Sequence, residues 1–151
     1  MKINFINETV LDNDTLESLC YQVAKLVRFN KDLTIHFKKK SIGSNYNTLG
    51  EADCPQNIIR IFVNQYKNCD YNTELDFNEK KISFVETCFY VIRSNVFGTL
   101  VHEFKHLIDY ERYFNNNVLL LEKEKSVHHY ENRPHEIRAR QLKSIMIKRL
   151  P

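Results

Sequence analysis

One segment of the chain combines a helical pattern with a chemical one: Thr99-Leu100-Val101-His102-Glu103-Phe104-Lys105-His106-Leu107-Ile108-Asp109-Tyr110. It contains the motif His-Glu-x-x-His, in which His102 and His106 are four residues apart. On an α-helix such residues lie one turn above each other on one face, so the two imidazoles can bind one metal ion. Glu103 follows His102 around the helix and can accept a proton from a metal-bound water. The segment therefore predicts a helix that carries a metal site with a general base beside it.

Helical geometry separates the polar residues of this region from the apolar ones. At about 100° per residue, the two histidines share one stripe with other polar side chains, and the large apolar side chains fall on the opposite side. The stripe contains Thr99, His102, His106, Asp109 and Tyr113, with Glu103 and Tyr110 beside it, and the opposite side contains Phe97, Leu100, Phe104, Leu107 and Ile108. Such a helix would bury its apolar face and present the histidines to a cleft.

A catalytic zinc site needs a third protein ligand and keeps a fourth position for water or substrate. Glu136 is the first candidate, because it falls in the first turn of an expected C-terminal helix whose rigid backbone can aim the carboxylate. The small Ala139, one turn later, would let the two helices approach each other. Glu131 is a second carboxylate option, and His128 or His129 would instead complete an all-histidine site.

Three other residues near the motif or in strands allow a chemical and a structural interpretation. Asp109 is three residues past His106, and we expect it either to hold a ligand histidine through its second ring nitrogen or to be an ordinary helix-surface carboxylate. His36 alternates within an expected strand and is expected to be structural. His135 is expected to be packed on its helix.

The remaining patterns predict a small α+β domain that occupies residues 1–151, with a sheet of two to four strands. Residues 13–28 read as a helix capped by Asn13 or Asp14, and residues 33–37 and 58–64 as strands. Residues 41–57 read as turns with room for a short strand at 46–49, and residues 65–80 as a loop. Residues 82–114 read as helical with a break near 94–95 or Gly98, and a last helix is expected from Pro134 to about residue 150.

Length and composition exclude several classes of protein. The chain has 151 residues, of which 42% are hydrophobic, which is enough for a buried core. The low content of three Gly and three Pro excludes collagen-like chains. The sequence has no run of about 18 apolar residues, so we expect no membrane-spanning helix. A net charge of +3 is too small to indicate nucleic-acid binding by itself.

The cysteines and the N-terminus indicate an intracellular protein. Cys20, Cys54, Cys69 and Cys88 lie far apart without a C-x-x-C pair, and Asn and Glu interrupt the first ten residues before a signal peptide could form. We therefore expect four reduced thiols in a cytoplasmic protein, with disulfides or cysteine-bound zinc as less favoured alternatives.

The histidine motif and the later segment Tyr130-Glu131-Asn132-Arg133-Pro134-His135-Glu136-Ile137-Arg138-Ala139-Arg140 resemble two parts of the zincin metallopeptidases. The closest resemblance is to small gluzincin-like proteins, namely minigluzincins, ImmA/IrrE-type peptidases and phage-encoded HExxH proteins. It implies that His102, His106 and Glu136 bind Zn²⁺ and that Glu103 is the general base for hydrolysis of a peptide or protein substrate. In such proteins the strand before the active-site helix often forms an edge beside the cleft, to which a peptide can add, and residues 58–64 are the candidate here.

Two other classes of function stay open at this point. A zincin-like domain without turnover would be a binding module, or a virion-associated component if the protein is phage-encoded. A SprT-like, nucleic-acid-associated protease would use a third histidine, for which His128 and His129 are available. Basic patches could come from residues 38–40 and from Arg138, Arg140, Lys143, Lys148 and Arg149, but solvated helix faces are the expected explanation.

Overall fold

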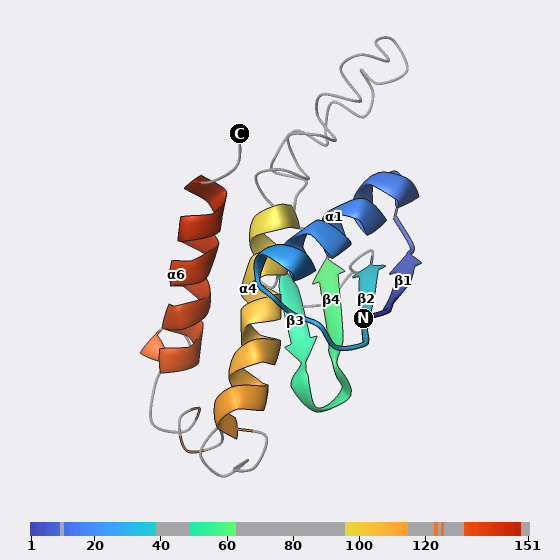
Figure 1. Ribbon diagram of the computed structural model, residues 1–151. Helices are drawn as coiled ribbons and strands as arrows, with labels where there is room; N and C mark the ends of the chain where they lie inside the picture. Colours follow the sequence, from blue (N-terminus) through green and yellow to red (C-terminus); the bar gives the residue numbers. More distant parts are fainter. Residues whose placement is uncertain are drawn as a thin grey trace, which may run out of the picture.

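The computed structural model describes residues 1–9, 11–38, 49–62, 96–114, 123, 125 and 132–148 (Figure 1). Within these ranges the chain forms a small sheet and three longer helices, so the expected α+β class is confirmed. The elements are β1 (Ile3–Asn7), α1 (Asn13–Leu26), β2 (Leu33–Lys38), β3 (Gly50–Asp53), the 3₁₀ turn η1 (Cys54–Gln56), β4 (Ile58–Phe62), α4 (Phe97–Asp109), the π-helical turn η5 (Tyr110–Phe114) and α6 (Pro134–Lys148).

The sheet has the strand order β1-β2-β4-β3. Strands β1, β2 and β4 are parallel, and β3 pairs with β4 in the antiparallel direction. The expectation that residues 58–64 form an edge strand is wrong, because β4 lies between β2 and β3, and residues 63–64 lie outside the described ranges. Strand β3 precedes β4 in the chain and is joined to it by η1. It pairs with β4 on the side away from β2. The edge of the sheet on this side is therefore β3.

Alternating apolar residues place one face of the sheet in the core. Leu33, Ile35 and Phe37 of β2 are buried, and the residues between them are only half-buried. The parallel register pairs Ile35 with Ile59 and Phe37 with Ile61, so the buried side chains of β2 and β4 form one continuous apolar surface.

Helix α1 follows β1 and precedes β2 in the chain, and its N-terminal cap differs from the expected one. The Asp12 carboxylate accepts hydrogen bonds from the backbone and the hydroxyl of Thr15, at 2.9 and 2.7 Å. The expectation of a cap at Asn13 or Asp14 is wrong, because both residues already belong to the helix and Asp12 precedes it. The buried side of α1 contributes Leu16, Cys20, Val23 and Ala24 to the core.

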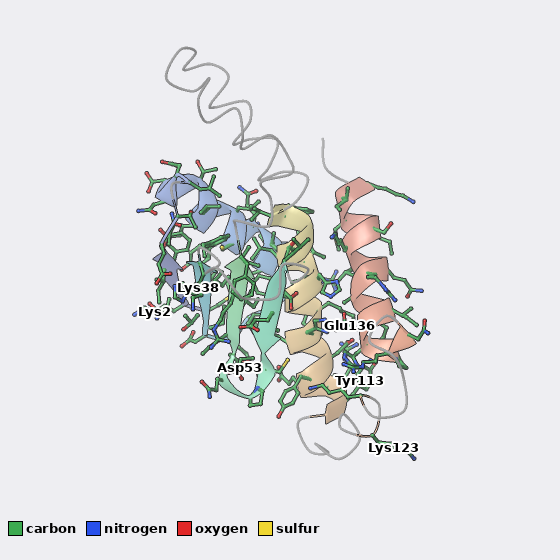
Figure 2. All side chains as sticks on the ribbon, turned by 180° about the vertical axis from the view of Figure 1, so that it is seen from behind. Lys2, Lys38, Asp53, Tyr113, Lys123 and Glu136 are labelled. Atoms are coloured by element: carbon green, nitrogen blue, oxygen red, sulfur yellow. The ribbon has the colours of Figure 1, made fainter. Side chains whose placement is uncertain are left out.

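Helix α4 lies between the sheet and α6 in both views (Figures 1 and 2). Its apolar side contributes Leu100, Phe104 and Leu107 to the core, where the ring of Phe104 meets the edge of Phe29 with centroids 5.4 Å apart. The colours of Figure 1 show that α6 runs antiparallel to α4 along its other side. Residues 82–95 of the expected helical region 82–114 lie outside the described ranges. The same holds for residues 41–48 of the expected turn region and for the loop expected over residues 65–80.

Strand β1 is an element that the sequence patterns did not lead us to expect. It pairs with β2 so that Ile3 lies opposite Leu33 and Phe5 opposite Ile35. The rings of Phe5 and Phe37 pack with their centroids 5.8 Å apart. The apolar–polar alternation of Ile3, Asn4 and Phe5 is the signal that could have identified this strand.

Two further expectations concern membranes and disulfides. A search of the described residues finds no helix long and apolar enough to cross a bilayer. Cys20 and Cys54 are free thiols, and Cys69 and Cys88 lie outside the described ranges.

Replacing Phe104 with Ala should test how far α4 depends on the core. The ring is fully buried, so its loss leaves a cavity, and we expect Phe104→Ala to lower the free energy of unfolding by about 3–5 kcal/mol. Ile145→Ala on α6 is the matched control, because Ile145 is 49% exposed. Its unfolding midpoint in urea should stay close to that of the wild type. Equal, small effects of both substitutions would contradict this description of the core.

Candidate metal centre

Helix α4 brings the two histidines of the motif together on its side facing α6. The Nε2 atoms of His102 and His106 are 3.1 Å apart, and the rings meet edge to face with centroids separated by 4.7 Å. Both side chains keep a small exposed fraction, 15% and 11%. The one-turn spacing of the motif therefore has the geometric result expected from helical periodicity.

Glu136 reaches the two imidazoles from the facing helix. Its Oε2 atom lies 3.0 Å from His102 Nε2, and its Oε1 atom lies 3.1 Å from His106 Nε2. Helix α6 begins at Pro134, which suits the first turn of a helix, so Glu136 extends from a fixed backbone. Figure 2 shows Glu136 between α4 and α6. The structure thus brings together the three residues singled out as metal ligands.

The three side chains could hold a metal ion. Their ligand atoms all lie within 4.8 Å of one another. In a tetrahedral zinc site with bonds of about 2.0–2.2 Å, neighbouring donors are about 3.3–3.6 Å apart. The two imidazole nitrogens are 3.1 Å apart, and each lies 3.0–3.1 Å from a different oxygen of Glu136, which is close to that spacing. Two imidazole nitrogens and one carboxylate are also a donor set that zinc accepts. The residues fit the metal that their sequence motif suggests.

Glu136 is an anion in this environment. Burial alone would raise the pKa of its carboxyl, but the hydrogen bonds with His102 and His106 and the charge of these rings outweigh burial. The pKa of Glu136 therefore lies below its usual range. A carboxylate that stays ionised is able to bind a cation without first losing a proton.

Glu103 has the opposite electrostatic character. It is 6% exposed, and burial, followed by the negative charges of Glu136 and Glu51, raises the pKa of its carboxyl to about 8. Lys143 of α6 acts in the other direction and lowers it. The pKa values of the two carboxyl groups in the candidate site are therefore shifted in opposite directions, that of Glu136 downward and that of Glu103 upward.

Gly50 of β3 provides the space in which Glu103 lies. A Cβ atom at this position would come within 2.8 Å of Thr99 Cγ2, 3.1 Å of the Arg60 carbonyl oxygen and 3.3 Å of Glu103 Cγ. Only a residue without a side chain lets the edge strand approach α4 this closely. Gly50 is a residue of the site that sequence reasoning did not identify, because its role depends on strand pairing.

Of the two described cysteines, Cys54 lies near the site. Its Sγ atom donates a weak hydrogen bond to the His106 carbonyl oxygen at 3.7 Å. Burial, followed by the negative charge of Glu103, raises the pKa of this thiol to about 12. Cys54 therefore stays protonated at neutral pH.

Asp109 takes a role different from both expected ones. It is 1% exposed, and its carboxylate accepts a hydrogen bond from Nε of Arg138 at 2.9 Å and forms an ion pair with Lys105 at 2.8 Å. It neither holds a ligand histidine nor lies on an open helix surface. The reason is that α6 supplies a guanidinium at this point, which the position of Asp109 in the sequence does not reveal.

Of the other histidines and the alternative ligands, His36 and His135 lie in the described part of the chain. His36 is paired with Glu8 at 3.1 Å on the sheet, as a structural residue would be. His135 is buried, and its ring centroid is 5.4 Å from that of His106. His128, His129 and Glu131 lie outside the described ranges.

Two of the cations considered for a basic patch, Arg138 and Lys143, contact α4. Arg138 contacts Asp109, and the stem of Lys143 lies across Gly98, where an added Cβ would come within 2.8 Å of Lys143 Cε. Burial lowers the pKa of Lys143, with the charge of Glu103 acting against this. These two cations therefore contact α4, and Arg149 lies outside the described ranges.

Comparisons of the chain with protein-family models, with curated proteins and with solved structures return no match.

Gly50→Ala should test the close approach of β3 to α4. The added methyl group would press on Thr99 and on a backbone oxygen of β4 that cannot move independently, and we expect a loss of about 1–3 kcal/mol in the free energy of unfolding. Glu51→Ala is the neighbouring control, because its exposed ion pair with Arg60 contributes less than about 1 kcal/mol. Urea unfolding followed by circular dichroism measures both. A Gly50→Ala variant as stable as the wild type would contradict the packing described here.

Proposed function

We propose that the protein is a zinc-dependent metallopeptidase of the zincin type. The observation that carries the proposal is the convergence of His102 Nε2, His106 Nε2 and the Glu136 carboxylate within 3.0–3.1 Å, with Glu103 on the same helix as the two histidines. The helix order and the antiparallel arrangement of α4 and α6 are compatible with this class. The motif supports the proposal because each of its residues has a chemical task in such an enzyme.

In the proposed site His102, His106 and Glu136 hold the metal. A bound zinc ion would lower the pKa of a coordinated water toward about 7 and polarise the carbonyl group of a substrate. The ionised state of Glu136 supplies one negative charge to the ligand set, which partly neutralises a divalent cation.

Glu103 is the proposed general base. It takes a proton from the attacking water and later gives it to the leaving amine. Its buried position favours the protonated form, while the positive charge of a cation held by its neighbours would favour the carboxylate. These opposing effects suit a group that must both accept and release a proton near neutral pH.

Metal content is the first test of the proposal. We expect about one zinc per purified chain by mass spectrometry, and none in the His102→Ala/His106→Ala double variant. His36→Ala is the matched control, because it removes a histidine that pairs with Glu8 on the sheet. It should keep the metal. A wild-type chain that takes up no zinc under reducing conditions, even when zinc is offered, would overturn the proposal.

The role of Glu103 requires a second test on zinc-loaded protein. Hydrolysis of a mixed peptide library, followed by mass spectrometry, should fall about 10²–10⁴-fold in Glu103→Gln while the zinc content stays unchanged. Glu17→Gln on α1 is the control and should cleave at the wild-type rate. Full hydrolysis by Glu103→Gln would refute the general-base assignment. A wild-type protein that holds zinc but cleaves no peptide of the library would favour a binding module instead.

A further inference from the structure

The interface between α4 and α6 contains an ion pair next to the candidate metal centre. Nε of Arg138 donates a hydrogen bond to Asp109 Oδ2 at 2.9 Å, and Lys105 Nζ lies 2.8 Å from Asp109 Oδ1. The carboxylate is 1% exposed, whereas the Arg138 side chain keeps 34% of its surface exposed. Asp109 therefore has one cationic partner on its own helix and a second on α6.

An aromatic ring lies against the guanidinium of the same arginine. The Cζ atom of Arg138 lies 5.4 Å from the centroid of the Tyr113 ring, within the range of a cation–π contact. Tyr113 belongs to the π-helical turn η5 that follows α4. Figure 2 shows Tyr113 near the C-terminal end of α4, next to the first turn of α6. Arg138 is thus held between a buried carboxylate and an aromatic ring, both supplied by the α4–η5 segment.

The ion pair lies close to the metal ligands on both helices. Asp109 is three residues past His106, and Arg138 is two residues past Glu136. At a rise of about 1.5 Å per residue, these separations are only about 4.5 Å and 3 Å along the helix axes. A shift of α6 that broke the ion pair would therefore also move Glu136 relative to the histidines.

Among the described residues, apolar packing constrains this end of α6 only weakly. The buried residues of α6 near Glu136 are His135 and Ala139, and Ala139 has a single methyl group. Its larger apolar contacts with the core, through Leu142, Met146 and Ile147, come later in the helix. A methyl group permits sliding and rotation that a directional ion pair does not.

We propose, on the basis of the function proposed above, that Asp109 and Arg138 are positioning residues for the metal centre. The ion pair fixes the rotation and axial position of α6 at which the Glu136 carboxylate meets both imidazoles. Metal–ligand distances tolerate deviations of only about 0.2 Å, so a small displacement of α6 weakens binding. The pair therefore acts on metal affinity and coordination geometry, in addition to any effect on folding.

The test compares the zinc affinity of variants that lose one positive charge from the same helix. Arg138→Gln removes the partner on α6 but leaves Asp109 paired with Lys105, so the buried carboxylate keeps a counter-charge and we expect the variant to fold. Arg140→Gln is the matched control, because Arg140 is exposed on α6 two residues farther along. Competition with a chromophoric zinc chelator, below the unfolding temperature of each metal-free variant, gives the affinities. We expect Arg138→Gln to bind zinc about 10–100-fold more weakly and Arg140→Gln to match the wild type.

Two more measurements separate positioning from a general loss of stability. The visible absorption spectrum of bound Co²⁺ reports coordination geometry, and it should change in Arg138→Gln but not in Arg140→Gln. Arg138→Lys restores a cation opposite Asp109 and should recover part of the affinity. Wild-type zinc affinity and an unchanged cobalt spectrum in Arg138→Gln would overturn this inference, as would an equal loss in Arg140→Gln. A wild-type chain that binds no zinc would instead defeat the proposed function itself.

Discussion

The contact of the buried Glu136 carboxylate with two imidazoles is the central polar interaction between α4 and α6. A buried carboxylate is costly unless cationic groups, hydrogen-bond donors or a metal compensate it. His102 and His106 supply that compensation from the facing helix at 3.0 and 3.1 Å. The same three residues therefore set the charge of the candidate ligand set and contribute to the docking of the last helix.

Helix α4 connects this polar interface to the apolar core. One side of the helix places Leu100, Phe104 and Leu107 against the sheet and α1, and the other side carries the histidines toward α6. The sheet thus determines the orientation of α4, and α4 determines where α6 can dock. Strand β3 completes the arrangement, because Gly50 lets the edge of the sheet come close enough to enclose Glu103.

Local patterns predicted those features that depend on local geometry. The periodicity around His102 and His106 and the proline at the start of α6 were sufficient to predict both helices, and Glu136 in the first turn of α6 lies against the two histidines. Long-range pairing was not accessible in this way. The sequence could not show that β3 covers the edge of β4, or that Arg138 meets Asp109, because these contacts join segments that only the fold brings together. Strand β1 was missed although its alternation is local, since one apolar Ile6 on the exposed side blurs the pattern.

The protonated thiol of Cys54 bears on the donor set of the candidate centre. Its sulfur lies next to the backbone of His106, yet with a pKa of about 12 it is not a thiolate at neutral pH. The cluster of side chains that could hold a metal ion contains His102, His106 and Glu136 but not this sulfur. Among the described residues, the candidate centre therefore presents nitrogen and oxygen donors, a set that suits a borderline ion such as Zn²⁺.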